Sequence, residues 1–477
     1  MTTIQPGDET AQSGTPAFTA PRGCPADITR LYGTTPDAGR DELWAALRER
    51  HGAVAPVELE TGVRAWLLLG YHENLTVLQN PHMFARDTRR WREVVEGRVD
   101  LASGRPALSW RPNVLYADGA EHTRLRGAVV DALARVDMAA TSRMVRQLCE
   151  ELIDGFVAEG RADLVAQYAN PLPVLVVNRL YGLSDSYGHM LGDLTAIIFD
   201  EDAKRGEDAI ARVHQYFSGL VDRKRERPGP DLVSWMLEHP AGLSGHEVAH
   251  QAALINSASH QPTTHLIGNT LRTLLSDNRI RGAYTDARLP VQELLDHVMW
   301  TDTPFQILPA RFALQDILIG SAEVRAGDAL LIGFDSAHRD PAVRRADDDG
   351  TGVASGSRAH LMFGAGPHAC PARELAKMIA ATAVTTLHER LSGMQLAVDP
   401  EELCWMPSPF LRGLRALPVS FAPGEPSTLD PAAVAGEPAS SRGEGHRDPS
   451  APDPGEDEAL EGDLLDRLLS WWRGLRG

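Results

Sequence analysis

The sequence is poor in cysteine and has no long apolar run. Its 477 residues include four widely separated cysteines: Cys24, Cys149, Cys370 and Cys404. No two of them form a CxxC pair, which argues against a structural zinc site or a disulfide framework and favours a reducing cytoplasm. No stretch of about 18 apolar residues occurs, and residues 1–23 lack an apolar core, so we expect neither a transmembrane helix nor a signal peptide.

Positive charge is scarce as well. Lysine and arginine number 47 against 65 aspartates and glutamates, which gives a net charge of −18. Because phosphate recognition needs a basic face, we expect no nucleic-acid partner. Hydrophobic residues make up 43% of the chain, which is enough for a large core.

Composition divides the chain into four segments. Residues 1–26 are polar and rich in proline, glycine, threonine and serine, which predicts disorder. The pattern is then continuous over 27–422, which predicts one large domain. Residues 423–459 are rich in proline, glycine, serine and acid, which is typical of a disordered linker. The last segment, 460–477, becomes apolar again at helical spacing and predicts an amphipathic helix.

The apolar face of this terminal helix is wide. Its members recur at three- and four-residue spacing: Leu460, Leu464, Leu465, Leu468, Leu469, Trp472 and Leu475. We predict that the helix docks on a partner protein or a membrane surface. A protein is favoured because the polar face has few basic residues to attract anionic lipid. The alternative is that the helix packs back on the body of its own chain.

The large domain has mostly helical periodicity. Apolar residues three and four apart predict helices in 41–52 and 121–136, and the pattern over 244–278 predicts a long helix through the core. Short runs at 63–70 and 312–334, with glycine or aspartate at their ends, predict strands. The fold class is therefore mainly α with a small β part.

The stretch FGAGPHACP carries the chemistry. Pro371 opens a helical pattern, and proline is favoured at the first helical position, so Cys370 lies at a helix N-terminus. The unpaired N–H groups and the helix dipole there are expected to lower the pKa of the thiol. Gly364 and Gly366 allow a tight turn and the close approach of a flat group.

Several kinds of site could contain this cysteine loop. A phosphate site is disfavoured because GAGPHA lacks the third glycine of a dinucleotide loop and no Lys-Ser/Thr follows it. A zinc site would need more ligands than Cys370, His368 and His360 offer. A cysteine nucleophile paired with a histidine and a buried structural cysteine both stay open at this point.

Residues 363–370 follow the pattern F-G-x-G-x-H-x-C and precede a helix. This pattern resembles the haem-binding loop of the cytochrome P450 family, and further landmarks extend the resemblance from about Cys24 to Val419. The resemblance implies a triangular helical body around a buried haem b. It also implies that Cys370 is the axial thiolate ligand of the iron.

The resemblance assigns further residues to the cofactor. Within the loop these are Phe363, Gly364 and Gly366, which lie against the porphyrin, and His368, which binds a propionate. The stretch EHTRLRGAVV resembles a family helix whose histidine and arginine reach the propionates, here His122 and Arg126; the alternative is a solvated charged face. The last two residues that the resemblance assigns to the cofactor are Arg311, on a strand that follows a family helix, and Ala258, on the long helix.

The long helix departs from the family pattern A-G-x-[DE]-T. Residues 258–262 read A-S-H-Q-P, so the acid is Gln261 and the alcohol is Pro262. Gln261 does not titrate, and Pro262 has no N–H for the carbonyl four residues earlier, so we expect the helix to kink or open there. His260 or Thr263 would take over the catalytic proton relay; the alternative is that His260 points elsewhere.

A second departure concerns the family signature E-x-x-R. The equivalent residues are Glu293 and Asp296, so the arginine has become an aspartate. We expect Glu293 to find another cation, such as an arginine within 338–350. Both losses, together with RDTRRW at 86–91, resemble an actinobacterial branch that often accompanies small-GTPase signalling modules, so a signalling partner is one hypothesis.

The resemblance implies a cytoplasmic oxidoreductase, a haem-thiolate monooxygenase acting on a small hydrophobic organic substrate. The sequence carries no flavin or iron–sulfur domain, so ferredoxin and ferredoxin reductase are the expected electron donors. The alternative is a haem-binding regulatory or sensor protein with little turnover, which the missing acid–alcohol pair favours. A cysteine hydrolase is a third reading.

Overall fold

The computed structural model describes residues 28–31, 40–60, 62–99, 110–198, 203–343, 358–427 and 463–476. The helices are α1 Arg40–His51, α2 Tyr71–Gln79, α3 Arg92–Val95, α4 Gly119–Ala134, α5 Met138–Asp154, α6 Pro171–Leu180, α7 Asp185–Ile198, α8 Ala203–Glu226, α9 Leu232–Glu238, α10 Gly245–Ser276, α11 Asn278–Thr285, α12 Val291–Thr301, α13 Phe334–His338, α14 Arg373–Arg390 and α16 Leu464–Arg476. The strands are β1 Thr29–Arg30, β2 Val54–Glu60, β3 Val63–Leu68, β4 Phe84–Ala85, β5 Arg161–Asp163, β6 Ile307–Ala313, β7 Ile317–Ile319, β8 Ala322–Val324, β9 Ala329–Gly333, β10 Gln395–Leu396 and β11 Pro418–Ser420.

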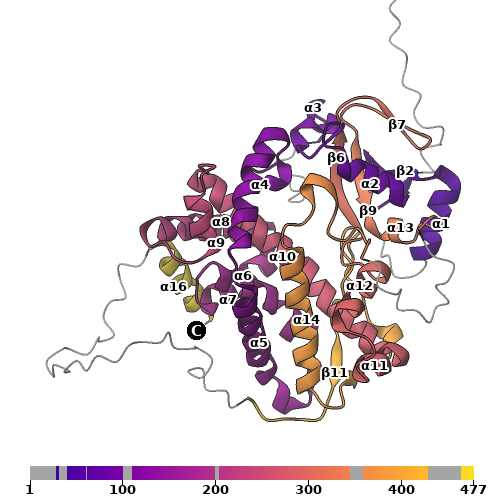
Figure 1. The fold of residues 1–477 in the computed structure, drawn as a ribbon. Coiled ribbons are helices and arrows are strands. Elements are labelled where there is room, and N and C mark those ends of the chain that lie inside the picture. Colours follow the sequence, from indigo (N-terminus) through magenta and orange to yellow (C-terminus); the bar gives the residue numbers. More distant parts are fainter. Residues whose placement is uncertain are drawn as a thin grey trace, which may run out of the picture.

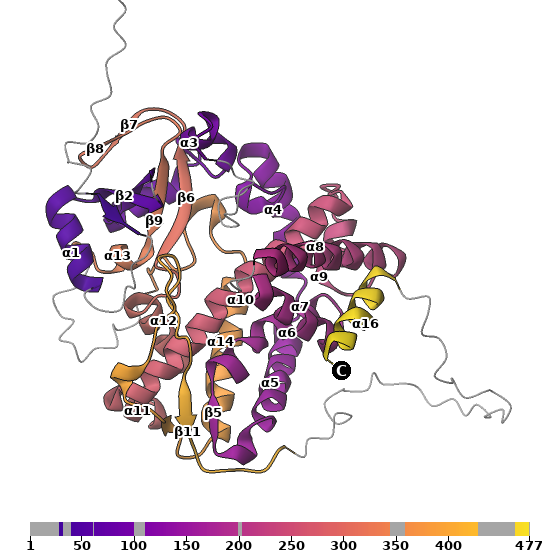
Figure 2. The ribbon, with the colours of Figure 1, turned by 180° about the vertical axis from the view of Figure 1, so that it is seen from behind.

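The strands form one larger sheet and two small ones. The larger sheet has the order β1-β2-β3-β9-β6-β4, and it brings N-terminal strands beside β6 and β9 from the second half of the chain. It lies at one corner of the molecule, and most of the rest is helical, with the small sheet of β5, β10 and β11 at the opposite end (Figures 1 and 2). The predicted mainly helical fold with a small β part is confirmed. Short pairs such as β10–β11 have too few residues for a recognisable alternating pattern.

Helix α10 crosses the helical part of the molecule and packs against α6, α8, α12 and α14 (Figure 1). Its start is fixed by a capping box: the Ser244 hydroxyl accepts from the Glu247 N–H, and the Glu247 carboxylate accepts from the Ser244 N–H. The helix runs without a break through Pro262, so the prediction that it opens there is wrong. Most residues from Pro262 onward are buried, and this packing offsets the one hydrogen bond that proline removes.

The terminal helix α16 packs on α7 and α8 of its own chain (Figures 1 and 2). Its apolar side chains Leu465, Leu468 and Leu469 are buried in the same cluster as residues of those two helices. Arg223 on α8 forms an ion pair with Asp463, and the Trp472 Nε1–H donates to Asp193 Oδ2 on α7 at 2.8 Å. The prediction that this face docks on a partner or a membrane is therefore wrong.

Residues 423–427, which follow the predicted end of the large domain at residue 422, contact the body of the protein. The described chain follows the body as far as Ser427, whose N–H donates to Asp154 Oδ1 at 2.9 Å. The Gly424 N–H donates to the Val157 carbonyl at 3.0 Å. Contacts with the body thus continue five residues past the predicted boundary. The rest of the predicted linker, and the predicted segment 1–26, lie outside the described residues.

Removing residues 428–477 is expected to lower the Tm of the protein by about 3 °C. Burial of three leucines stabilises by several kcal/mol before the cost of ordering the helix, and one kcal/mol shifts the Tm of a large domain by a few degrees at most. Thermal unfolding followed by circular dichroism measures the shift. Leu468→Ser should reproduce most of it, while Arg467→Ser, at an exposed neighbouring position, should not. An unchanged Tm after truncation would contradict a stabilising role for α16.

Candidate functional site

The cysteine loop is closed by its own backbone. The Cys370 N–H donates to the Phe363 carbonyl at 2.8 Å, and the Gly364 N–H donates to the Leu361 carbonyl at 2.7 Å. Cys370 is partly exposed and lies three residues before α14. The helix begins at Arg373 with Ala372 as its N-cap, so the prediction that Pro371 is its first residue is wrong by two positions. These bonds hold the sulfur at a fixed place at the start of α14.

Both loop glycines have left-handed backbone angles, with φ of 69° at Gly364 and 68° at Gly366. Only glycine adopts these angles without strain. A Cβ on Gly366 would overlap the Leu78 carbonyl oxygen at the end of α2. The close approach expected at Gly366 is therefore made by protein backbone, whereas Gly364 has no neighbour within ordinary contact distance of such a Cβ except the loop itself.

Basic side chains from three elements converge beside the loop. The rings of His122 on α4 and His368 in the loop lie 4.1 Å apart between centroids. Arg126, one turn along α4, donates to the Ala369 carbonyl. Arg311 on β6 is buried, and burial is the largest cause that lowers its pKa, with Arg86 adding to it. The four residues that the sequence predicted for one anionic group thus lie together.

This basic cluster contains side-chain nitrogens that the described residues do not satisfy. Arg311 Nη1 and His122 Nε2 are buried without a hydrogen-bond partner among the parts of the chain that the structure describes. Burial lowers the pKa of His368, and the charges of Arg311 and Arg86 lower it further. The described part of the chain supplies little negative charge here: Asp118 Oδ1 lies 3.9 Å from His368 Nε2. The arrangement is suited to a group that brings two negative charges.

Arg86 and Asp118 are parts of this site that the sequence did not reveal as such. Arg86 Nη1 donates to the carbonyls of Pro309 and Ala310 at 2.8 and 2.9 Å, directly before Arg311. The Asp118 carboxylate accepts from the backbone N–H of Arg86 at 2.9 Å. Both therefore position the cluster. The motif RDTRRW was the available signal, but it did not indicate which arginine turns inward.

Comparison with known proteins identifies the family. No model of a protein family matches the chain. Among curated proteins, the cytochrome P450 monooxygenase PikC of Streptomyces venezuelae is 31% identical over 392 residues, which cover 80% of this chain and 91% of PikC. The chain belongs to the cytochrome P450 family.

Other P450s support the assignment. The 6-deoxyerythronolide B hydroxylase of Saccharopolyspora erythraea is 29% identical over 406 residues, covering 81% of this chain and 98% of that enzyme. Among solved structures, CYP154C4 from Streptomyces has a TM-score of 0.75 at 26% identity, covering 83% of this chain and 98% of that one. The myxobacterial CYP267B1, solved with myristic acid, has a TM-score of 0.73 at 28% identity, covering 82% and 98%.

The P450 family fixes the cofactor and the reaction class. The cofactor is haem b, and the protein is a monooxygenase of small organic substrates that draws electrons from an external redox partner. The relatives are named as monooxygenases and hydroxylases, so the alternative of a regulatory haem protein finds no support. Actinobacterial relatives also fit the predicted branch. No helix in the described ranges is long and apolar enough to cross a membrane.

The thiol of this P450 differs from the expectation in one respect. Burial raises the pKa of Cys370, although the Ala372 N–H and the guanidinium groups of Arg126 and Arg373 act in the opposite direction. The expected lowering by the helix N-terminus is therefore wrong for the protein alone, because desolvation outweighs the dipole. A bound metal cation deprotonates a ligating thiol, which reverses this balance.

The four residues of α10 predicted for the catalytic site differ in burial and in contacts. His260 is buried, and its Nε2 lies 3.0 Å from Asn170 Oδ1 beside the start of α6. The imidazole ring of His260 is thus engaged beside the start of α6, in agreement with the alternative that His260 points away from the proton relay. Gln261 is half-buried, Pro262 and Thr263 are buried, and Ala258 is exposed although it lies in the middle of the helix.

The two acidic residues of the altered E-x-x-R motif lie in different environments. Glu293 is exposed, and no ion pair is found for it among the described residues. Arg339, the described arginine of the expected partner segment, pairs instead with Asp335 and Asp41, while 344–350 lie outside the described residues. Arg339 is therefore not the cation predicted for Glu293, and the prediction stays untested for the arginines at 344 and 345. Asp296 is the buried member of the motif.

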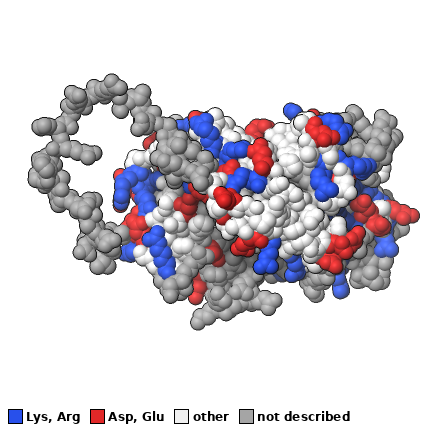
Figure 3. All heavy atoms as spheres, turned by 90° about the horizontal axis from the view of Figure 1, so that it is seen from below, with Lys and Arg blue, Asp and Glu red and all other residues white. Residues whose placement is uncertain are grey.

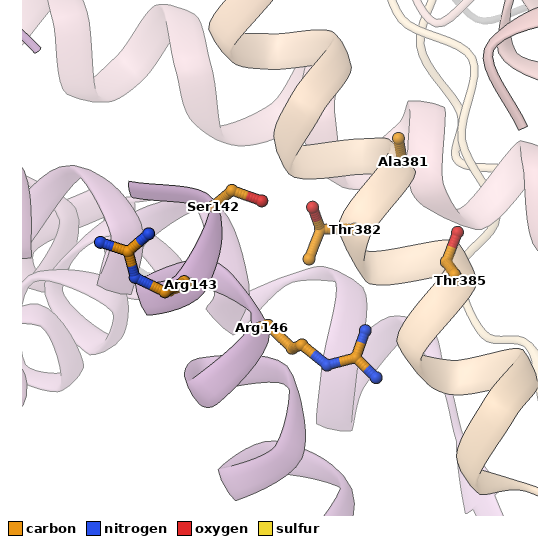
Figure 4. Close-up of a pocket in the computed structure, with 6 residues that line it drawn as sticks. All are labelled: Ser142, Arg143, Arg146, Ala381, Thr382 and Thr385. Carbon is orange, nitrogen blue, oxygen red and sulfur yellow. The ribbon is translucent and has the colours of Figure 1, made fainter. Parts of the chain in front are cut away.

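A shallow surface pocket of about 260 Å³ lies between α5 and α14 (Figure 4). Arg143 and Arg146 come from α5, and Thr382 and Thr385 from α14. None of its lining residues belongs to the predicted site, and Arg146 is already paired with Glu389. On the face seen from below, basic and acidic side chains are interspersed (Figure 3), which favours such local ion pairs.

Proposed function

We propose that Cys370 is the thiolate ligand of the haem iron in this P450, and that the propionates are held by His122, Arg126, Arg311 and His368. The observation that carries the proposal is the buried, unpartnered Arg311 Nη1 beside an unpartnered His122 Nε2. Two carboxylates at this place would satisfy both donors and balance the converging positive charge.

The rest of the pocket follows from the loop and α10. Phe363, Gly364 and Gly366 would contact the haem from the cysteine loop, and Ala258, a small exposed residue of α10, would contact it from that helix. When bound, haem supplies the redox chemistry that activates O2. For proton supply we propose Gln261 as a hydrogen-bonding residue and Thr263 as the nearest hydroxyl along α10, with the Ala258 carbonyl freed by Pro262.

The substrate is proposed to be small and hydrophobic, and the electron donors to be a ferredoxin with its reductase. The relatives support the first point, since one is named a vitamin D(3) 25-hydroxylase and another is a P450 solved with myristic acid. The scattered cysteines offer no cluster motif for an internal electron relay. The free thiols of Cys149, Cys370 and Cys404 support a reducing, cytoplasmic location.

The domain boundaries also stay a proposal. We propose that the P450 domain begins near residue 27, that residues 1–26 precede it as a polar segment, and that the acidic stretch ending at 459 serves as the tether of α16. The contacts of Gly424 and Ser427 with the body support a tether that starts after residue 427.

Arg311→Met tests the propionate assignment. The variant removes a guanidinium that has an unpartnered nitrogen, so the haem-free protein should be at least as stable as wild type. Haem binding should weaken by about tenfold or more, since a charged hydrogen bond of ~1.5–3 kcal/mol is lost. Titration of the haem-free protein with haem, and its thermal unfolding, measure the two effects.

Arg86→Met is the matched control, because the Arg86 guanidinium donates to carbonyls of the chain itself. It should destabilise the haem-free protein. If Arg311→Met lowered haem-free stability and left haem affinity unchanged, the assignment of Arg311 to a propionate would be wrong.

A further inference from the structure

Asp296, which stands where the family motif has an arginine, contacts two basic side chains. Asp296 Oδ1 accepts from Lys377 Nζ at 2.7 Å and lies 3.4 Å from His360 Nε2. All three side chains are largely buried, with exposed fractions of 7% for Asp296, 12% for Lys377 and 5% for His360. A buried carboxylate with two converging donors is costly to break, because loss of either partner leaves a buried group unpaired.

These contacts join three elements around the cysteine loop. Asp296 lies on α12, Lys377 lies on α14 seven residues after Cys370, and His360 lies ten residues before Cys370. One carboxylate therefore holds both arms of the loop, the segment that enters it and the helix that leaves it. Because α12 and α14 also pack against each other, the anchor point is rigid.

The entering arm has a second, uncharged attachment beside the first. His338 at the end of α13 accepts the Leu361 N–H through Nε2 at 2.8 Å. Trp300 packs against both histidines, with its ring centroid 4.7 Å from that of His338 and 6.5 Å from that of His360. The arm is thus held from α13 by a neutral bond and from α12 by the Asp296 carboxylate.

The charge state of the anchor follows from these neighbours. Burial alone would raise the pKa of Asp296, but the hydrogen bonds from His360 and Lys377 outweigh it and lower the pKa. Asp296 is therefore ionised where the family motif carries a cation. The sign at this position is inverted, and Lys377 supplies the positive charge from the opposite helix.

We propose that Asp296, Lys377 and His360 form a charge-inverted anchor that takes the place of the E-x-x-R network and positions Cys370 for thiolate ligation. The proposal rests on the proposed ligation by Cys370. Asp296 and Lys377 act through the loop and are positioning residues.

The sharpest test restores the family residue. Asp296→Arg should impair the protein, since the new guanidinium would face Lys377 and His360. We expect most of the red-shifted Soret band of the reduced carbon-monoxide complex to be lost and the Tm to fall by roughly 5 °C. Glu293→Gln, one turn earlier and exposed, is the matched control and should change neither quantity. An Asp296→Arg variant with wild-type spectrum and Tm would overturn the proposal.

A double-mutant cycle separates the pair from general disruption. Asp296→Asn and Lys377→Met should each lower the Tm and the fraction of thiolate-ligated protein, and their combination should cost clearly less than the sum. Exchange of the charges, Asp296→Lys with Lys377→Asp, should recover part of both losses. Additive losses in the milder cycle would refute the anchor even if the exchange variant did not fold.

The two proposals fail in different ways. If the wild-type protein lacked the thiolate band, Cys370 ligation would be wrong, while the Tm cycle would still report whether the pair is coupled. If the band is present and the losses are additive in both readouts, the ligation stands and the anchor is refuted.

Discussion

Cys370→Ala is expected to abolish the red-shifted Soret band of the reduced carbon-monoxide complex and to reduce monooxygenase turnover to background. The physical reason is that the thiolate donates charge to the iron, and no other described cysteine lies in the loop before α14. The backbone bonds that hold the loop do not involve the side chain of Cys370, so the fold should survive. Difference spectra of the purified, haem-loaded variant measure the effect.

The other cysteines provide the controls. Cys404→Ala removes an exposed thiol and should leave spectrum and stability unchanged. Cys149 is fully buried, and burial raises its pKa to about 12, so it stays a thiol; Cys149→Ala should keep the band at some cost in stability. Cys24→Ala should keep the band as well. Retention of thiolate ligation in Cys370→Ala would show that the ligand is a different residue.

The parts of this site that could be predicted are those encoded locally. The cysteine loop is a contiguous pattern in which two glycines with positive φ have a physical reason, and the proline after the cysteine indicated a following helix, which begins two residues later than predicted. Helix α10 was predictable from its length and periodicity, and the long helix was found at almost the expected bounds. His122 and Arg126 were predictable because they share one helix face.

The parts that could not be predicted depend on contacts between distant segments. The sequence shows that α16 has an apolar face but not which surface covers it, and the structure places α7 and α8 there. In the same way, the partner of Asp296 comes from 81 residues away, and the sequence analysis looked for a cation for Glu293 instead. Arg86 was noted only as part of a motif, because its acceptors lie 223 and 224 residues further along the chain.

Wild-type protein is expected to couple electron transfer to product formation poorly and to use hydrogen peroxide better than O2 with a reduced ferredoxin. Hydrogen peroxide already carries two electrons and two protons, so it bypasses the proton delivery that an acid and an alcohol on α10 would support. Here Gln261 does not titrate, His260 is engaged with Asn170, and Pro262 has no hydroxyl, while the proposed hydroxyl of Thr263 stands one residue beyond the family's alcohol position. A general acid–base relay is worth about 10² to 10⁴ in rate, so its absence should be measurable.

Gln261→Glu combined with Pro262→Thr is expected to raise coupled turnover by at least about tenfold, because it restores an acid and an alcohol at neighbouring positions. The backbone tolerates the change, since α10 is already helical through Pro262 and threonine returns an N–H for the Ala258 carbonyl. Product formed per reducing equivalent, with peroxide release measured in parallel, gives the coupling. Pro262→Ala is the matched control: it restores the N–H without a hydroxyl, so it should stabilise the helix and leave the coupling unchanged. A tightly coupled wild type would refute the prediction, and so would a double variant that gains no more than Pro262→Ala, because the loss of the acid and the alcohol would then not limit the reaction.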